Sequence, residues 1–171
     1  MSRAYNFSAG PAVLPLEVLQ DAQKNLVDYQ GCGMSVMEMS HRGKDYDAIH
    51  QEAIATFKEL CGLNDDWSVC FIQGGASMQF AMIPMNFLNV GQVADYGKQG
   101  TWSGKALKEA EKVAALRSAK ISVAADCQKD IPTRMPNANE WRWTQGAVYS
   151  HICSNETIAG AELKEFPNTG S

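Results

Sequence analysis

Apolar residues recur every three or four positions along two stretches of the first half of the chain. One begins near Pro15, which suits the first turn of a helix, and Gly31 and Gly33 end it. The other follows Lys44, and Gly62 stands where a C-terminal cap belongs. This spacing predicts two amphipathic helices. Their apolar positions are Leu16, Leu19, Ala22 and Leu26 in the first, and Tyr46, Ile49, Ala53, Phe57 and Leu60 in the second.

The pattern changes after residue 66, where short apolar runs typical of buried strands alternate with helical segments. "WSVCFI" reads as a buried strand, and the apolar helix that follows it should be kinked or interrupted at Pro84. Such alternation predicts an α/β fold with a largely parallel sheet. Further strands are expected at "GQVADYG" (91–97), "KISVAA" (120–125) and "AVYSHIC" (147–153), and a helix at "TWSGKALKEAEKV" (101–113).

Composition and charge narrow the function classes. The 171 residues carry a net charge of −4, which does not favour a nucleic-acid partner. There is no apolar run long enough to span a membrane and no signal peptide, so we expect a cytoplasmic protein, or an organellar one if a transit peptide was removed. The five cysteines form no Cys-x-x-Cys pair and predict buried thiols. The three histidines lack metal-ligand spacing.

In parallel sheets ligands bind at the carboxyl ends of the strands, so the loops 73–79, 97–103 and 154–160 are the candidate ligand-binding loops. Gly74 and Gly75 precede a helix whose free N–H groups could hold a phosphate, or they form a plain turn. Trp102 could stack on a flat ring or pack into the core. The polar run Asn155–Thr157 could serve a ligand or cap a helix.

A further cluster, "MSHRGKD", places three potentially cationic side chains within four residues, just ahead of the second helix. From charge and position alone it is a solvated loop. Its alternative is a site for an anion, with His41 and Arg42 as the binding groups and Lys44 as a helix-entry charge.

Taken in order, "NFSAGPAVLP", "GMSVMEMSHRGKDY", "FIQGGASMQFAMIPMNFL", "ADYGKQGTWSGKALKEAEK" and "HICSNETIAGAE" resemble the phosphoserine aminotransferase family from Tyr5 to about Pro167. The resemblance implies pyridoxal 5′-phosphate (PLP) as cofactor and part of the large domain of a three-layer α/β/α fold. It also implies a cofactor site: backbone N–H groups at Gly75, Ala76 and Ser77 for the phosphate, Trp102 stacked over the ring, and the Thr157 hydroxyl on the ring substituents.

The resemblance further implies that Arg42 grips the substrate carboxylate, and that His41 helps with the substrate phosphate, often across a homodimer interface. Some family members have serine where this chain has Ala9, so Ala9 offers only a backbone contact. Some have arginine where this chain has Ser77, which leaves a second cation absent or supplied elsewhere. The implied substrates are L-glutamate and 3-phosphohydroxypyruvate, and the implied products are O-phospho-L-serine and 2-oxoglutarate.

No lysine of the chain ends a strand where the family's Schiff-base lysine is expected, so we expect no catalytic residue within these 171 residues. We therefore expect an amino-terminal arm (1–14) and an incomplete large domain (15–171), inactive alone and without the small domain. Two alternatives stay open: a related PLP aminotransferase of other specificity, and a non-catalytic fragment or subunit of a split protein.

Overall fold

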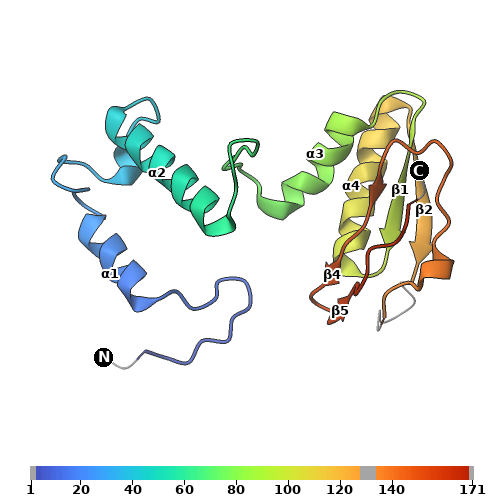
Figure 1. Ribbon diagram of the computed structural model, residues 1–171, viewed down its shortest axis with the longest axis horizontal. Helices are drawn as coiled ribbons and strands as arrows, with labels where there is room; N and C mark the ends of the chain where they lie inside the picture. The colour runs from blue at the N-terminus through green and yellow to red at the C-terminus, as the bar shows by residue number, and fades with distance from the viewer. Residues whose placement is uncertain (1–2, 128–133, 170–171) are drawn as a thin grey trace. The chain divides into compact units, whose positions relative to one another are not determined.

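The computed structural model describes residues 3–127 and 134–169, which divide into two compact units, 1–71 and 72–171 (Figure 1). Each unit is described by itself. The first contains helix α1 (Leu16–Asn25), the short 3-10 helix η1 (Val36–Glu38) and helix α2 (Lys44–Cys61). Residues 3–15 form neither helix nor strand, and the division at residue 14 stays a prediction.

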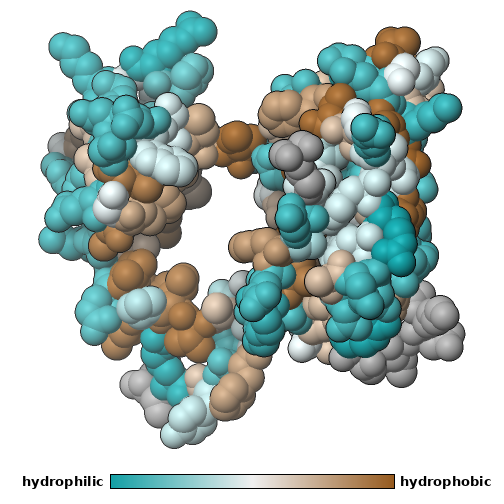
Figure 2. Space-filling model, turned by 45° about the vertical axis from the view of Figure 1, so that its right-hand side comes forward, coloured by the Kyte–Doolittle hydropathy of each residue, from teal (hydrophilic) through white to brown (hydrophobic). Residues whose placement is uncertain are grey.

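Both helices of the first unit begin and end largely where their sequences indicate. Pro15 precedes α1, which ends at Asn25, several residues before the glycines expected to stop it. The N–H of Gly62, which has a left-handed backbone (φ 63°), closes the last turn of α2. No residue of α1 or α2 is buried: Tyr46 and Ile49 are half-buried, and the other apolar positions that predicted these helices are exposed. Apolar side chains also show as brown areas on the surface in Figure 2.

The prediction of a buried strand at 67–72 is wrong for this chain. These residues form no strand, and Trp67, Phe71 and Ile72 are more than half exposed. A parallel strand needs a neighbour for its backbone N–H and C=O groups. Among the described residues no strand pairs with this segment, so its apolar composition alone does not make it one.

The second unit is built around a three-stranded parallel sheet in the order β2-β1-β3. Helix α3 (Gly75–Phe87) precedes β1 (Val93–Lys98), and helix α4 (Thr101–Arg117) connects β1 to β2 (Lys120–Asp126). Strand β3 is Ser150–His151, and its residues pair with Asp95 and Tyr96 of β1. The 3-10 helix η2 (Ala138–Glu140) and a small antiparallel pair, β4 (Asn155–Glu156) and β5 (Ala161–Glu162), complete the unit.

The core lies between the central strand and α4. In β1 the four inner residues are all buried, as expected for a strand covered on both faces. Tyr96 packs with Leu88, Ala106 and Ala110, and its hydroxyl lies 2.8 Å from that of Tyr149. Burial raises the pKa of Tyr96, so its phenol stays neutral. The central strand is therefore a rigid support for the loop that follows it.

Two further expectations are tested by the second unit, and one by the cysteines of both units. The helix containing Pro84 is not interrupted there, because it continues to Phe87 with Pro84 buried. The last strand is shorter than 147–153, although the N–H of Val148 donates to the carbonyl of Val93 at 2.9 Å.

The five cysteines are free thiols. The expectation that they are buried is wrong, since none of them is buried and Cys61 and Cys70 are exposed. No helix in the described ranges combines the length and apolarity needed to cross a bilayer.

Candidate functional site

The loops after the neighbouring strands β1 and β3 meet at the start of α4. Glu156, in the second loop, is fully buried. Its two carboxylate oxygens accept from the backbone N–H groups of Trp102 and Ser103, each at 2.8 Å. Because free N–H groups at a helix start carry the positive end of the helix dipole, a carboxylate is stabilised there. The contact joins two loops more than fifty residues apart in sequence.

The same two loops are joined a second time through side chains. The indole Nε1–H of Trp102 donates to the hydroxyl oxygen of Thr157 at 2.7 Å. Trp102 is half-buried rather than packed into either core cluster, so core packing does not account for it. Lys105, one turn along α4, holds its ammonium 4.5 Å from the centre of the indole ring. The ring is thus fixed at its polar edge.

The turn between β1 and α4 has its own internal support. The buried hydroxyl of Ser103 accepts from the N–H groups of Gln99 and Gly100, both at 2.8 Å. Gly100 has no side chain because none fits: a Cβ there would lie 2.6 Å from the carboxyl carbon of Glu156. This turn therefore holds the start of α4, and with it Trp102, in one conformation.

Helix α3 presents its start differently. Gly74 and Gly75 have positive φ angles of 89° and 56°, and a side chain on Gly74 would collide with Met78. No side chain caps the helix and its first turn contains no acidic residue. Gly75, Ala76 and Ser77 are exposed and their N–H groups have no partner within the helix, so they are available to an anion, while phosphate binding there stays a prediction. At the start of helix α4 the N–H groups of Trp102 and Ser103 are not available to an anion, because Glu156 already accepts from both.

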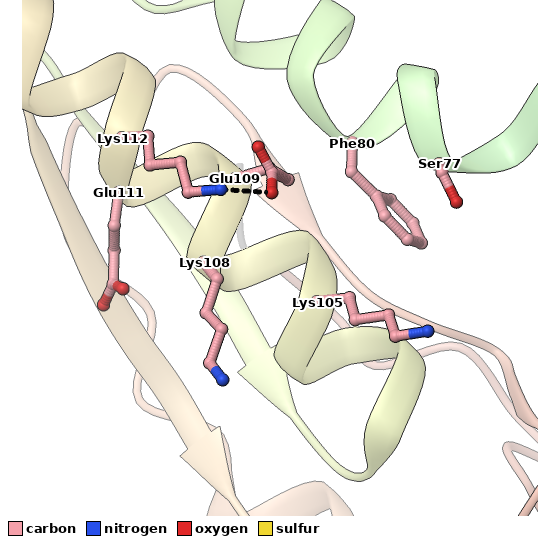
Figure 3. Close-up of a pocket in the computed structure, with 7 residues that line it drawn as sticks. All are labelled: Ser77, Phe80, Lys105, Lys108, Glu109, Glu111 and Lys112. Atoms are coloured by element: carbon pink, nitrogen blue, oxygen red, sulfur yellow. Dashed lines mark hydrogen bonds and ion pairs between the residues drawn. The ribbon is translucent and has the colours of Figure 1, made fainter. Parts of the chain in front are cut away.

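The two helices border a cavity of about 750 Å³. Figure 3 shows its lining: Ser77 and Phe80 come from α3, and Lys105, Glu109 and Lys112 come from α4. Lys112 is paired with Glu109 at 2.6 Å, whereas the Lys105 side chain extends toward the end of the cavity where Ser77 lies. The cavity thus reaches the candidate site through Ser77 and Lys105, and the rest of it is helix surface.

The cysteine nearest to the site is held inactive. Cys153 lies in the loop after β3, where burial raises the pKa of its thiol and the charge of nearby Glu156 raises it further. The thiol is therefore protonated at neutral pH and is a poor nucleophile.

The remaining predicted residues, Ala9, His41 and Arg42, belong to the first unit. His41 and Arg42 are exposed in the turn that leads into α2, where the N–H of Arg42 donates to the Ser40 hydroxyl at 3.2 Å. Within the described ranges neither side chain forms an ion pair or hydrogen bond, so both are available to a ligand. Ala9 lies in an exposed turn whose ends are joined by the N–H of Ala12 and the carbonyl of Ser8.

The structure joins Trp102 to Thr157 within the second unit, and Ser77 lines the same cavity as Lys105, whose ammonium lies over the Trp102 ring. The cofactor roles expected for these residues stay predictions. The sequence places Glu156 only within a polar run, and it gives no separate signal for Ser103 or Lys105. Which helix Glu156 caps has no local signal, because that helix begins far away in sequence.

The fold and this arrangement of loops define a class. The model of the aminotransferase class-V family matches residues 4–171, and the chain belongs to that family.

Among the described residues there is no group of three histidine, cysteine or acidic side chains able to hold a metal ion.

Particular relatives carry the same enzyme name. The chain is 53% identical to phosphoserine aminotransferase of Niallia circulans over 99% of its own length and 45% of that protein. It is 48% identical to phosphoserine aminotransferase of Geobacillus kaustophilus, again over 99% of the chain and 46% of the relative. The chain thus spans under half the length of these curated relatives.

Solved structures agree with this placement. The phosphoserine aminotransferase from Bacillus circulans subsp. alkalophilus superimposes with a TM-score of 0.85 at 53% identity, covering 99% of this chain and 45% of that one. The PLP-bound phosphoserine aminotransferase from Trichomonas vaginalis superimposes with a TM-score of 0.88 at 38% identity, covering 99% and 49%. The fold is therefore that of part of an α/β aminotransferase domain, and the three-layer arrangement stays a prediction.

Proposed function

We propose that this chain is part of a PLP-dependent phosphoserine aminotransferase, which moves the amino group of L-glutamate to 3-phosphohydroxypyruvate. The observation that carries the proposal is the match over almost the whole chain to relatives of that name. The Trp102–Thr157 pair and the uncapped start of α3, both at the candidate site, support it.

The residues present fit the cofactor. The free N–H groups at Gly75, Ala76 and Ser77 suit a phosphate dianion, and no carboxylate in the first turn of α3 opposes it. Trp102 offers an aromatic face to a pyridine ring, and Thr157 offers a hydroxyl to its substituents. When bound, PLP supplies the carbonyl that carries the amino group and an electron sink for the carbanion.

The charge of the phosphate needs a partner besides the helix. Ser77 stands where some family members have an arginine, so that cation is absent from its usual position. Lys105 lines the same cavity as Ser77 and has no carboxylate partner among the described residues. We propose that Lys105 contributes the missing positive potential on the phosphate side.

For the substrate, we propose Arg42 as the carboxylate ligand. Its guanidinium can donate two parallel hydrogen bonds to a carboxylate, and it is exposed and has no ion-pair partner among the described residues. His41 would bind the substrate phosphate, and Ala9 would offer its backbone. The catalytic lysine would come from residues outside this chain.

Assembly and location are also proposals. We propose a homodimer in the cytoplasm, with His41 serving a site shared between the two copies. Light scattering of the full-length protein tests the dimer, since a monomeric, fully active enzyme would contradict it.

The assay for the proposal compares two acceptors in the full-length protein with L-glutamate as donor. We expect kcat/KM to be much higher for 3-phosphohydroxypyruvate than for unphosphorylated hydroxypyruvate, because the latter lacks the anion that His41 is expected to bind. Equal use of both would point instead to an aminotransferase of other specificity. No activity with either, together with no PLP binding, would favour a non-catalytic protein.

The substrate residues are tested by Arg42→Ala with Lys44→Ala as the matched control. Both side chains are exposed cations near the start of α2. Loss of a bidentate, charge-assisted contact should lower kcat/KM about 100-fold in Arg42→Ala. Lys44→Ala should stay near the parent, and near-normal activity of Arg42→Ala would reject the assignment.

A further inference from the structure

The most tightly held feature of the site is a side chain with no assigned role. Glu156 is fully buried, and both of its oxygens bind backbone N–H groups in the first turn of α4. Helix α4 begins after Gly100, which cannot supply a capping side chain. The cap therefore comes from the loop after β3, and Gly100 leaves the room for it.

This cap fixes the position of Trp102 from two directions. Glu156 holds the backbone N–H of Trp102, and its neighbour Thr157 holds the indole N–H. A tryptophan bound at both its backbone and the far edge of its ring has little freedom left in its two side-chain torsions. Consecutive residues of one loop thus orient the ring that is proposed to stack on the cofactor.

The same contact sets the chemistry of Thr157. An indole N–H only donates, so the Thr157 oxygen must accept it. The hydroxyl hydrogen is then left for another acceptor, and none is recorded for it among the described residues. Thr157 therefore faces a ligand as a donor, which suits an anionic or carbonyl oxygen on the ring.

We propose that Glu156 is a positioning residue: without touching the cofactor, it holds Trp102 and Thr157 together as a preformed seat for the cofactor ring. This inference rests on the proposed function, since the seat is for PLP. It predicts that loss of the carboxylate weakens cofactor binding beyond what loss of stability explains.

The variant is Glu156→Gln in the full-length protein, and the matched control is Asp95→Asn. Asp95 is also fully buried, and its carboxylate accepts from the N–H and hydroxyl of Thr144 at 2.6 Å and 2.7 Å. It touches neither site loop. Both variants remove the charge of a buried carboxylate that accepts two hydrogen bonds, so both should lower the melting temperature of the cofactor-free protein.

The readout is binding of pyridoxamine 5′-phosphate to the cofactor-free protein by calorimetry. This probe has no aldehyde, so it reports non-covalent contacts. We expect the Kd to rise about 10-fold or more in Glu156→Gln and to stay within about 2-fold in Asp95→Asn. In a Trp102→Ala background the Glu156→Gln change should raise the Kd by a smaller factor than in the parent, because the ring that Glu156 orients is gone and only Thr157 remains.

Other outcomes are decisive as well. An unchanged Kd in folded Glu156→Gln, or the same fold-loss with and without Trp102, would make Glu156 a structural cap only. If Glu156→Gln does not fold, Glu156→Asp keeps the charge with a shorter reach, and a Kd equal to the parent's would overturn the proposal. If the parent itself fails to bind the probe, the proposed function fails, which is a separate result.

Discussion

Ser103→Ala tests how strongly the turn before α4 depends on one hydroxyl. The buried oxygen of Ser103 accepts from the N–H groups of Gln99 and Gly100 and donates to the carbonyl of Gly100 at 3.2 Å. Alanine leaves both N–H groups buried without an acceptor. An unsatisfied buried donor costs about 1–3 kcal/mol. Partial relaxation of the turn reduces the sum, so we expect a loss of about 2–4 kcal/mol in the free energy of unfolding.

The assay is urea denaturation of the cofactor-free full-length protein, followed by tryptophan fluorescence. Ser122→Ala is the control, because the Ser122 hydroxyl shares a single recorded hydrogen bond, with the Thr144 hydroxyl at 3.1 Å. It should cost about 1 kcal/mol or less. A loss below about 0.5 kcal/mol in Ser103→Ala, with the control unchanged, would refute the reasoning that the hydroxyl satisfies both amides.

Three further predictions concern the same unit. Gly100→Ala should destabilise the protein by about 2–4 kcal/mol, because its Cβ would lie 2.6 Å from the Glu156 carboxyl carbon and displace the carboxylate from its two amides; unchanged unfolding would contradict this expected clash. Burial lowers the pKa of His151, so below about pH 6.5 the unfolded state binds more protons and stability should fall with pH down to the lowered pKa. His151→Phe should lose this dependence in pH-resolved thermal melts, and an identical pH profile would argue against it. The buried amide of Gln99 has no hydrogen-bond partner among the described residues, so Gln99→Met should raise the free energy of unfolding by about 1 kcal/mol in urea melts, whereas a decrease would reveal a further partner.

The sequence predicted best those elements whose signals are local. The period of α2 and its end at Gly62, the helix α4 and the strands β1 and β2 all agree with expectation. Each depends on side-chain spacing or a single backbone angle within a few residues. Such signals are present in the residues that form the element, so they can be read without knowing what surrounds it.

Features that depend on distant partners could not be predicted in this way. Residues 67–72 have the composition of a buried strand, yet pairing and burial come from other segments, and the structure shows them exposed. The sequence places Glu156 only within a polar run, for which a helix cap or turn is one interpretation. Glu156 reaches the start of α4 because β1 and β3 are neighbours in the sheet. This pairing is a feature of the tertiary structure and has no signal in the local sequence.

The candidate site shows the same division. The glycine pair before α3 predicted the turn into that helix correctly, because the need for positive φ is local, whereas phosphate binding there stays a prediction. The Trp102–Thr157 hydrogen bond joins residues that only the fold brings together. The roles of His41, Arg42 and Ala9 stay predictions, because they belong to the other unit.

The proposed amino-group transfer is tested most directly by following the nitrogen atom of L-glutamate. The full-length protein, loaded with PLP, would be incubated with ¹⁵N-labelled L-glutamate and 3-phosphohydroxypyruvate, and the products analysed by mass spectrometry. We expect ¹⁵N-labelled O-phospho-L-serine and an equal amount of 2-oxoglutarate. Unlabelled acceptor recovered intact, with PLP bound, would contradict it.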